Sequence, residues 1–241
     1  MEPVLVSDLR YRLGTMRRTR TRVAFYRQFV RPGELAFDVG AHVGDRTELL
    51  LRAGASVVAV EPQPLLREKL ERAFGADPRV TLVAEAVGAE PGTAELRWPA
   101  GGLALASMSE EWIDRVRDSG RFEAEWGDRT LVPVTTLDAL IERYGAPSFC
   151  KIDVEGYEET VLGGLSHPIR TVSIEFIPEN LDSTERALAK LGELADYRFN
   201  YAVGESLALS ERRWLGRDEL LAQLRKCVAR SFGDVYARVG G

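Results

Sequence analysis

Apolar and polar positions in the first half of the chain follow two alternating periods. Short apolar runs at residues 35–40, 56–62 and 80–88 are separated by segments 45–54 and 64–75, whose apolar residues recur with helical spacing. A glycine closes each helical segment, and the second has a proline near its first turn, which are common helix boundaries. The pattern predicts a β-α-β-α-β series, which builds a parallel sheet covered by helices on both faces.

The same alternation returns in the second half of the chain. We predict strands over 130–134, 148–153, 171–176 and 234–239, and helices over 135–145, 157–164, 183–194 and 216–227. Residues 197–203 and 206–210 are expected to pair as a hairpin around Gly204.

The chain is predicted to form one α/β domain, residues 33–241, preceded by a basic helical extension, residues 1–32. No internal repeat or low-complexity linker divides it. Residues 90–130 interrupt the alternation with a strand-like run, a stretch of small residues and an uncertain polar segment. Because long loop-rich inserts in compact domains are usually functional, we expect this insert to act as a lid over the substrate side.

The N-terminal extension is strongly basic although the net charge of the chain is −5. It contains no acidic residue between Arg10 and Arg31, and its arginines are Arg10, Arg12, Arg17, Arg18, Arg20, Arg22, Arg27 and Arg31. Such a segment attracts a phosphate group, an acidic carrier protein or a lipid surface. The interleaved aromatic residues fit equally well with an amphipathic helix that docks on the acidic remainder of the chain.

Composition excludes several classes of protein. The chain is 45% hydrophobic and 29% charged, which is ordinary for a globular protein, and it has no apolar run long enough to span a membrane. The first residues lack the pattern of a signal peptide. The only cysteines, Cys150 and Cys227, are far apart, which argues against a disulfide framework and a zinc site. We expect a soluble, cytoplasmic protein.

Acidic residues stand where the first three predicted strands end. Asp38 precedes a G-x-x-x-G turn formed by Gly40 and Gly44, and an acid there suits a cationic group rather than the pyrophosphate of NAD. Glu61 ends the second strand and suits the two hydroxyls of a ribose. Glu85 follows in the third strand, where it and the neighbouring backbone would meet an adenine edge. Ligands of parallel sheets bind at these strand ends.

The most unusual stretch is "CKIDVEGYE", residues 150–158. Lys151 and Asp153 lie on one face of a predicted central strand, because side chains alternate along a strand. A buried lysine needs a partner, and Asp153 or Glu175 on the next strand is the natural one. We expect Asp153 to orient or deprotonate a hydroxyl group, with Lys151 and Glu175 tuning it.

Together these motifs resemble a known family. "FDVGAHVGDRT", "VVAVEP" and "AEAVG" are similar to class I S-adenosylmethionine-dependent methyltransferases, and "VPVTTLDALI", "KIDVEGYEETVLGG" and "IEF" to the FkbM-type family within them. The resemblance implies a doubly wound, Rossmann-like, seven-stranded, mostly parallel sheet and methyl transfer from S-adenosyl-L-methionine, usually to oxygen. His42 stands where asparagine is more usual. The implied cofactor contacts are Asp38, Gly40, His42, Gly44, Thr47, Glu61, Pro62, Glu85, Ala86 and Asp153.

Other interpretations remain open at this stage. Asp153, Glu155 and Glu175 would suit a Mg²⁺ ion if they converged, or would form a structural ion-pair network with Lys151. Ser107 and Glu155 are candidate contacts to a small, hydroxyl-bearing substrate. The basic N-terminus suits an RNA methyltransferase, although the acidic remainder makes nucleic acid a poor partner. A further possibility is a non-catalytic module that binds the cofactor or a partner protein.

Overall fold

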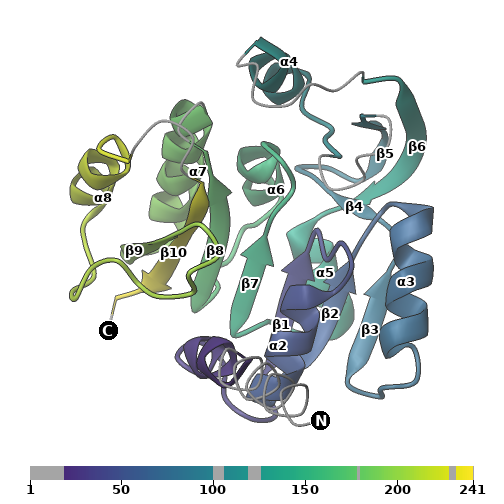
Figure 1. The fold of residues 1–241 in the computed structure, drawn as a ribbon, viewed down its shortest axis with the longest axis horizontal. Helices are drawn as coiled ribbons and strands as arrows, with labels where there is room; N and C mark the ends of the chain where they lie inside the picture. Colours follow the sequence, from purple (N-terminus) through teal and green to yellow (C-terminus); the bar gives the residue numbers. More distant parts are fainter. Residues whose placement is uncertain (1–18, 100–105, 119–125, 178–179, 228–231, 241) are drawn as a thin grey trace, which may run out of the picture.

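A seven-stranded sheet forms the centre of the molecule (Figure 1). The computed structural model describes residues 19–99, 106–118, 126–177, 180–227 and 232–240. The strands follow the order β3 (Val80–Val83), β2 (Ser56–Val60), β1 (Leu35–Val39), β7 (Phe149–Ile152), β8 (Thr171–Phe176), β10 (Gly233–Val239) and β9 (Tyr197–Val203). Strands β3 to β8 in this order run parallel, and β10 is antiparallel to both of its neighbours. The predicted fold class is confirmed.

Helices cover both faces of this sheet. Residues 19–26, α2 (Asp45–Ala53) and α3 (Pro64–Phe74) contribute to one apolar cluster, and α5 (Leu137–Tyr144), α6 (Glu158–Gly163), α7 (Leu181–Leu194) and α8 (Arg217–Leu224) contribute to the other. Two of the predicted helix boundaries are confirmed by their capping geometry. Thr136 caps α5 by accepting a hydrogen bond from the backbone N–H of Ala139 at 3.1 Å, and Gly54 ends α2 with φ 109°.

The predicted third strand, residues 80–88, is wrong as a single element. The chain leaves the main sheet after Val83, and residues Ala86–Val87 form β4 of a second sheet. This three-stranded sheet has the order β4, β6 (Asp128–Thr135) and β5 (Gly92–Trp98). Burial explains the break, because Ala86 packs with Leu96 and Val132 in a separate apolar cluster. Figure 1 shows this sheet and α4 (Glu110–Asp118) beyond the carboxyl ends of β1 and β7.

The described part of the N-terminal extension is built into the domain. Residues 19–26 are helical, and Phe25, Tyr26 and Phe29 are almost completely buried. Phe29 stacks on Tyr236 and on Phe149, with ring centroids 5.1 Å and 5.5 Å apart. Residues 1–18 lie outside the described residues, so the proposed role of the basic segment stays a prediction.

The predicted hairpin partner, residues 206–210, is not a strand. The chain after Gly204 instead forms a loop, joined to β9 by a hydrogen bond from the backbone N–H of Ser210 to the backbone oxygen of Tyr201 at 2.7 Å and by an isolated bridge between Phe199 and Leu215. Leu207 anchors the loop in the core with only 3% of its surface exposed. None of the helices in the described ranges is both long enough and apolar enough to cross a membrane.

Candidate active site

A cavity of about 290 Å³ lies at the carboxyl ends of β1, β2 and β7. The residues predicted from the sequence that line it are Gly40, His42, Glu61, Pro62, Glu85, Ala86, Asp153, Glu155 and Glu175. Among the residues that the structure describes, none of those lining it is a lysine or an arginine. The strand ends therefore meet at one site, as the parallel topology predicts.

Glycine at position 40 lets the loop after β1 approach the end of β7. Gly40 has φ 80°, and a Cβ atom there would lie 1.9 Å from the backbone oxygen of Asp153. Gly44, at φ 90°, instead faces Leu70 and Phe74 of α3. Gly40 therefore shapes the cavity, whereas Gly44 permits the packing of α2 against α3.

Asp38 lies beneath the cavity rather than in its wall. The side chain is 1% exposed, and its Oδ2 accepts a hydrogen bond from the Thr47 hydroxyl at 2.6 Å. Burial raises the pKa of Asp38. We expected both residues to contact the cofactor, but neither lines the cavity, so in this structure they support the loop from below.

Glu61 is the carboxylate best placed for hydroxyl groups. Its two oxygens accept backbone hydrogen bonds from His42 and Gln63, each 2.9 Å long, which fixes their direction. Burial raises the pKa of Glu61 to about 7, although these two hydrogen bonds oppose the shift. Each oxygen keeps a further acceptor position. Glu85 lines the same cavity, where Arg143 donates to its carboxylate at 2.6 Å.

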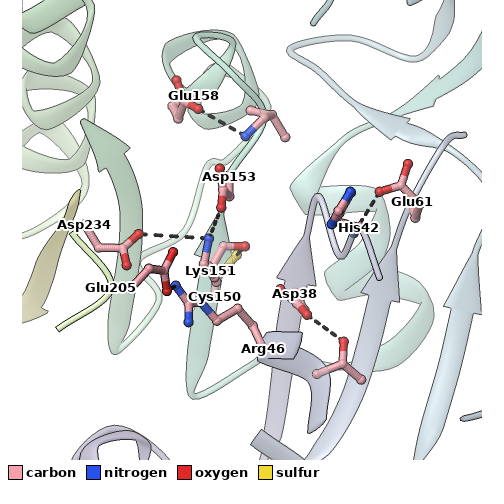
Figure 2. Close-up of polar contacts among 12 residues, drawn as sticks. Asp38, His42, Arg46, Glu61, Cys150, Lys151, Asp153, Glu158, Glu205 and Asp234 are labelled. Carbon is pink, nitrogen blue, oxygen red and sulfur yellow. Dashed lines mark hydrogen bonds and ion pairs between the residues drawn. The ribbon is translucent and has the colours of Figure 1, made fainter. Parts of the chain in front are cut away.

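Lys151 bridges two carboxylates inside the sheet (Figure 2). Its ammonium donates a hydrogen bond to Asp153 and lies 4.0 Å from Oδ1 of Asp234. Burial by itself lowers the pKa of Lys151, but the two acids outweigh it and raise that pKa above its usual range. Of the two expected partners, Asp153 is correct and Glu175 makes no described ion pair with Lys151. The neighbouring Cys150 is buried, which raises the pKa of its thiol and makes it a poor nucleophile.

Acidic side chains converge at the end of the cavity nearest β7 and β8. Asp153, Glu155 and Glu175 each offer an oxygen, and these atoms lie within 4.8 Å of one another. Burial, together with the negative charges of Glu155 and Asp153, raises the pKa of Glu175 well above its ordinary value. The geometry is compatible with the magnesium site considered from the sequence, which stays a prediction.

Hydrogen bonds to Glu158 of α6 and to Ser107 of the insert hold the loop that follows β7. Glu155 and Gly156 have φ values of 53° and 86°, and Glu158 accepts hydrogen bonds from the backbone of Val154 and Gly156 at 3.1 Å and 3.2 Å. Ser107 donates to the backbone oxygen of Glu155 at 2.7 Å. Because Ser107 is completely buried, it positions this loop instead of forming the substrate contact that we expected.

Other residues at the site carried no recognisable signal in the sequence. Glu205, from the loop after β9, lines the cavity and accepts a hydrogen bond from Arg46 at 2.6 Å. Asp234 reaches Lys151 from the last strand. Leu96, Ala106 and Met108 of the insert form an apolar wall of the cavity.

Comparison with protein families now identifies the domain. Residues 38–201 match the family described as methyltransferase FkbM domain. The chain belongs to this family. It is therefore a methyltransferase that uses S-adenosylmethionine, as the resemblance of its motifs implies. Among curated proteins, no sequence matches this chain.

Solved structures of other methyltransferases share its general architecture at low sequence identity. A precorrin-6y C5,15-methyltransferase from Geobacter metallireducens is 11% identical, with a TM-score of 0.48 over 92% of this chain and 86% of that chain. A putative rRNA methylase from Clostridium thermocellum is 9% identical, with a TM-score of 0.45 over 90% and 93%. An O-methyltransferase from Thermotoga maritima is 13% identical, with a TM-score of 0.42 over 91% and 65%.

Proposed function

We propose that this FkbM-family enzyme transfers the methyl group to a hydroxyl oxygen of a small molecule. The observation that supports the proposal is the position of Asp153, which faces the cavity while the buried ammonium of Lys151 holds its carboxylate from behind. This arrangement gives the cavity a fixed acceptor for the proton of a hydroxyl group.

The residues at the other end of the cavity suit S-adenosylmethionine. When bound, this cofactor supplies a methyl group activated by a sulfonium cation. Glu61 would accept hydrogen bonds from the ribose hydroxyls, and the Gly40 turn leaves room for the amino-acid part. Pro62 and Ala86 would border the adenine, with Glu85 at its edge.

Asp153 would orient the acceptor hydroxyl and take its proton as the oxygen–methyl bond forms. Correct orientation of two reacting groups is worth roughly 7–11 kcal/mol, and a positioned base contributes about 10²–10⁴-fold in rate. Orientation therefore supplies the larger share. Glu175 and Glu155 would contact polar groups of the acceptor beside Asp153, which agrees with their place in the cavity wall.

The charge of the cavity favours a small neutral or cationic acceptor over a nucleic acid. Glu155, Glu175 and Glu205 line the cavity together with Asp153, and its lining within the described part of the chain offers no lysine or arginine for phosphate. Acidic walls repel a polyanion, whose binding relies on basic side chains. The apolar wall formed by Leu96, Ala106 and Met108 adds a surface for a carbon skeleton.

A methyl-transfer screen tests the proposal. Purified enzyme is incubated with methyl-labelled S-adenosylmethionine and with panels of polyols, sugars, hydroxylated macrocycles, amines, thiols and RNA. We expect label in a hydroxyl-bearing small molecule, as a methyl ether identified by mass spectrometry and NMR. Transfer to RNA, or to nitrogen or sulfur with no methyl ether formed, would contradict the proposal. The Asp153→Asn variant separates catalysis from cofactor binding.

A further inference from the structure

Lys151 is a single buried cation between two acids that come from different parts of the chain. Its side chain is 2% exposed, and those of Asp153 and Asp234 are 33% and 8% exposed. Only Asp153 lines the cavity. Figure 2 shows Asp234 reaching Lys151 from a different side than Asp153, and Asp234 does not line the cavity.

Sheet register explains how Asp234 reaches a lysine two strands away. Lys151 of β7 pairs with Ser173 of β8, and Asp234 of β10 pairs with Glu175 of β8. Paired residues point to the same face of a sheet, so all these side chains share one face. Ser173 is small, which leaves the space above β8 open between the ammonium of Lys151 and the carboxylate of Asp234.

Other contacts fix the orientation of Asp234. The hydroxyl of Tyr236 donates to its Oδ2 at 3.2 Å, so that Oδ1 faces Lys151. Arg46 is also close enough to act on Asp234 electrostatically, but its guanidinium donates directly to Glu205. Lys151 is thus the cation that Asp234 faces most directly.

We propose that Asp234 is a positioning residue that sets the charge of the cavity by sharing Lys151 with Asp153. One cation between two carboxylates leaves a net negative charge. If Lys151 belonged to Asp153 alone, the ammonium would neutralise the carboxylate that faces the ligand. With Asp234 in place, Asp153 keeps part of its negative charge for the sulfonium cation of the cofactor and for the proton of the acceptor.

The inference rests on the part of the proposed function that places S-adenosylmethionine beside Asp153, and not on the identity of the methyl acceptor. The inference can be tested without a methyl acceptor. Two ligands that differ in whether their sulfur carries a positive charge show how the electrostatic potential of the cavity affects binding. S-adenosylmethionine carries the sulfonium cation, and S-adenosylhomocysteine carries a neutral thioether in its place. The ratio of their dissociation constants therefore measures how strongly the site prefers the cation.

The experiment measures both dissociation constants by calorimetry for the wild type and Asp234→Asn, which keeps the shape of the side chain and removes its charge. We expect the variant to bind S-adenosylmethionine about 5–10-fold more weakly, and S-adenosylhomocysteine within about twofold of the wild type, as removal of one charge in the site predicts. Asp234→Glu, which keeps the charge, should restore the wild-type ratio.

A matched variant isolates the effect. Asp196→Asn removes an acid whose side chain is 79% exposed and which does not line the cavity, so it should keep the wild-type ratio. If Asp234→Asn does not fold, Asp234→Ser serves in its place, since it leaves room for a water molecule.

Equal weakening of the binding of both ligands, or an unchanged ratio of their dissociation constants, would overturn the inference. Failure of the wild type to bind either ligand would contradict the cofactor site itself, whereas failure to methylate a hydroxyl would leave the inference standing.

Discussion

The side chain of Asp153 accepts a hydrogen bond from Lys151, the residue two positions earlier in the chain. Lys151 lies near the end of strand β7, and Asp153 directly follows this strand and lines the cavity. Strand alternation places both side chains on one face, so the motif itself aims a carboxylate at the ligand and supplies the cation that holds it. This geometry is the basis for the predictions that follow.

Replacement of Asp153 by asparagine should separate binding from catalysis. The amide keeps the size of the side chain but accepts no proton, so methyl transfer should fall by about 10²–10⁴-fold. Binding of S-adenosylhomocysteine should change by less than about tenfold, because the other cavity contacts remain. Calorimetry and the labelled-methyl assay check this, with Asp196→Asn as the matched control. Full activity in Asp153→Asn would remove this residue from the mechanism.

Cofactor affinity should depend on pH through Glu61. Its pKa in the folded protein is raised to about 7 by burial, and ribose hydroxyls bind the ionised carboxylate. Binding therefore requires loss of a proton below pH 7, so the affinity should weaken by up to about tenfold per pH unit as the pH falls. Calorimetry with S-adenosylhomocysteine between pH 5.5 and 8.5 checks the slope. Glu61→Gln should bind weakly and without this dependence, and a sloping profile in that variant would assign the titration to another group.

Loss of Lys151 should destabilise the fold. Lys151→Met fills the same volume but leaves the buried carboxylate of Asp234 without its cation, and breaking a buried pair costs about 3–5 kcal/mol. Urea denaturation measures the free energy of unfolding. Lys226→Met, at an exposed lysine of similar chemistry, should change it by less than about 0.5 kcal/mol. A further Asp234→Asn substitution should restore part of the loss, and its failure to do so would show that the two residues are not coupled.

The sequence places Gly40 and Glu61 at one cavity because their positions depend on local pattern. Both residues follow strand ends, and a parallel sheet brings successive strand ends together, whereas Asp38 lies beneath the cavity. The resemblance to the FkbM family adds the seven-stranded, mostly parallel sheet. The local hydrophobic pattern does not predict where the chain leaves one sheet and joins the other. Residues 80–88 are mostly apolar, and the packing of Ala86 against Leu96 and Val132 shows that this stretch divides between two sheets.

Part of the acceptor half depends on distant residues, which explains why Asp234 and Glu205 were missed. Asp234 meets Lys151 across β8, and Glu205 enters the cavity from the loop after β9, where a hairpin turn was predicted. Ser107 illustrates a different limit of the sequence. A serine among small residues suggests a ligand contact, and only the structure shows that this side chain is buried. The acceptor, the cytoplasmic location and the role of the basic N-terminus stay predictions.

Two glycine substitutions should have opposite effects on stability. Gly156 has φ 86°, and an added Cβ would lie 2.3 Å from the ring of Trp112 in α4. Gly156→Ala should therefore cost at least about 1–3 kcal/mol and displace α4 from the loop after β7. Gly192 lies exposed in α7 with nothing within 4 Å of such a Cβ, so Gly192→Ala should stabilise by roughly 0.5–1 kcal/mol. Denaturation curves and tryptophan fluorescence compare the two, and equal effects would refute the assigned contact with Trp112.

Glu158 should make the stability of the enzyme depend on pH. Burial raises the pKa of Glu158 in the folded protein to about 7, while in the unfolded chain the carboxyl group titrates near its ordinary value of 4.5. The folded state therefore holds a proton that the unfolded state releases, so this contribution is complete at low pH and is lost as the pH rises from about 4.5 to 7. Glu158→Gln keeps the acceptor for the backbone of Val154 and Gly156 without a titrating group. Relative to the wild type, the variant should gain roughly 2–3 kcal/mol between pH 5 and pH 8. Urea denaturation at each pH measures the difference, and a constant difference across this range would show that Glu158 does not titrate there.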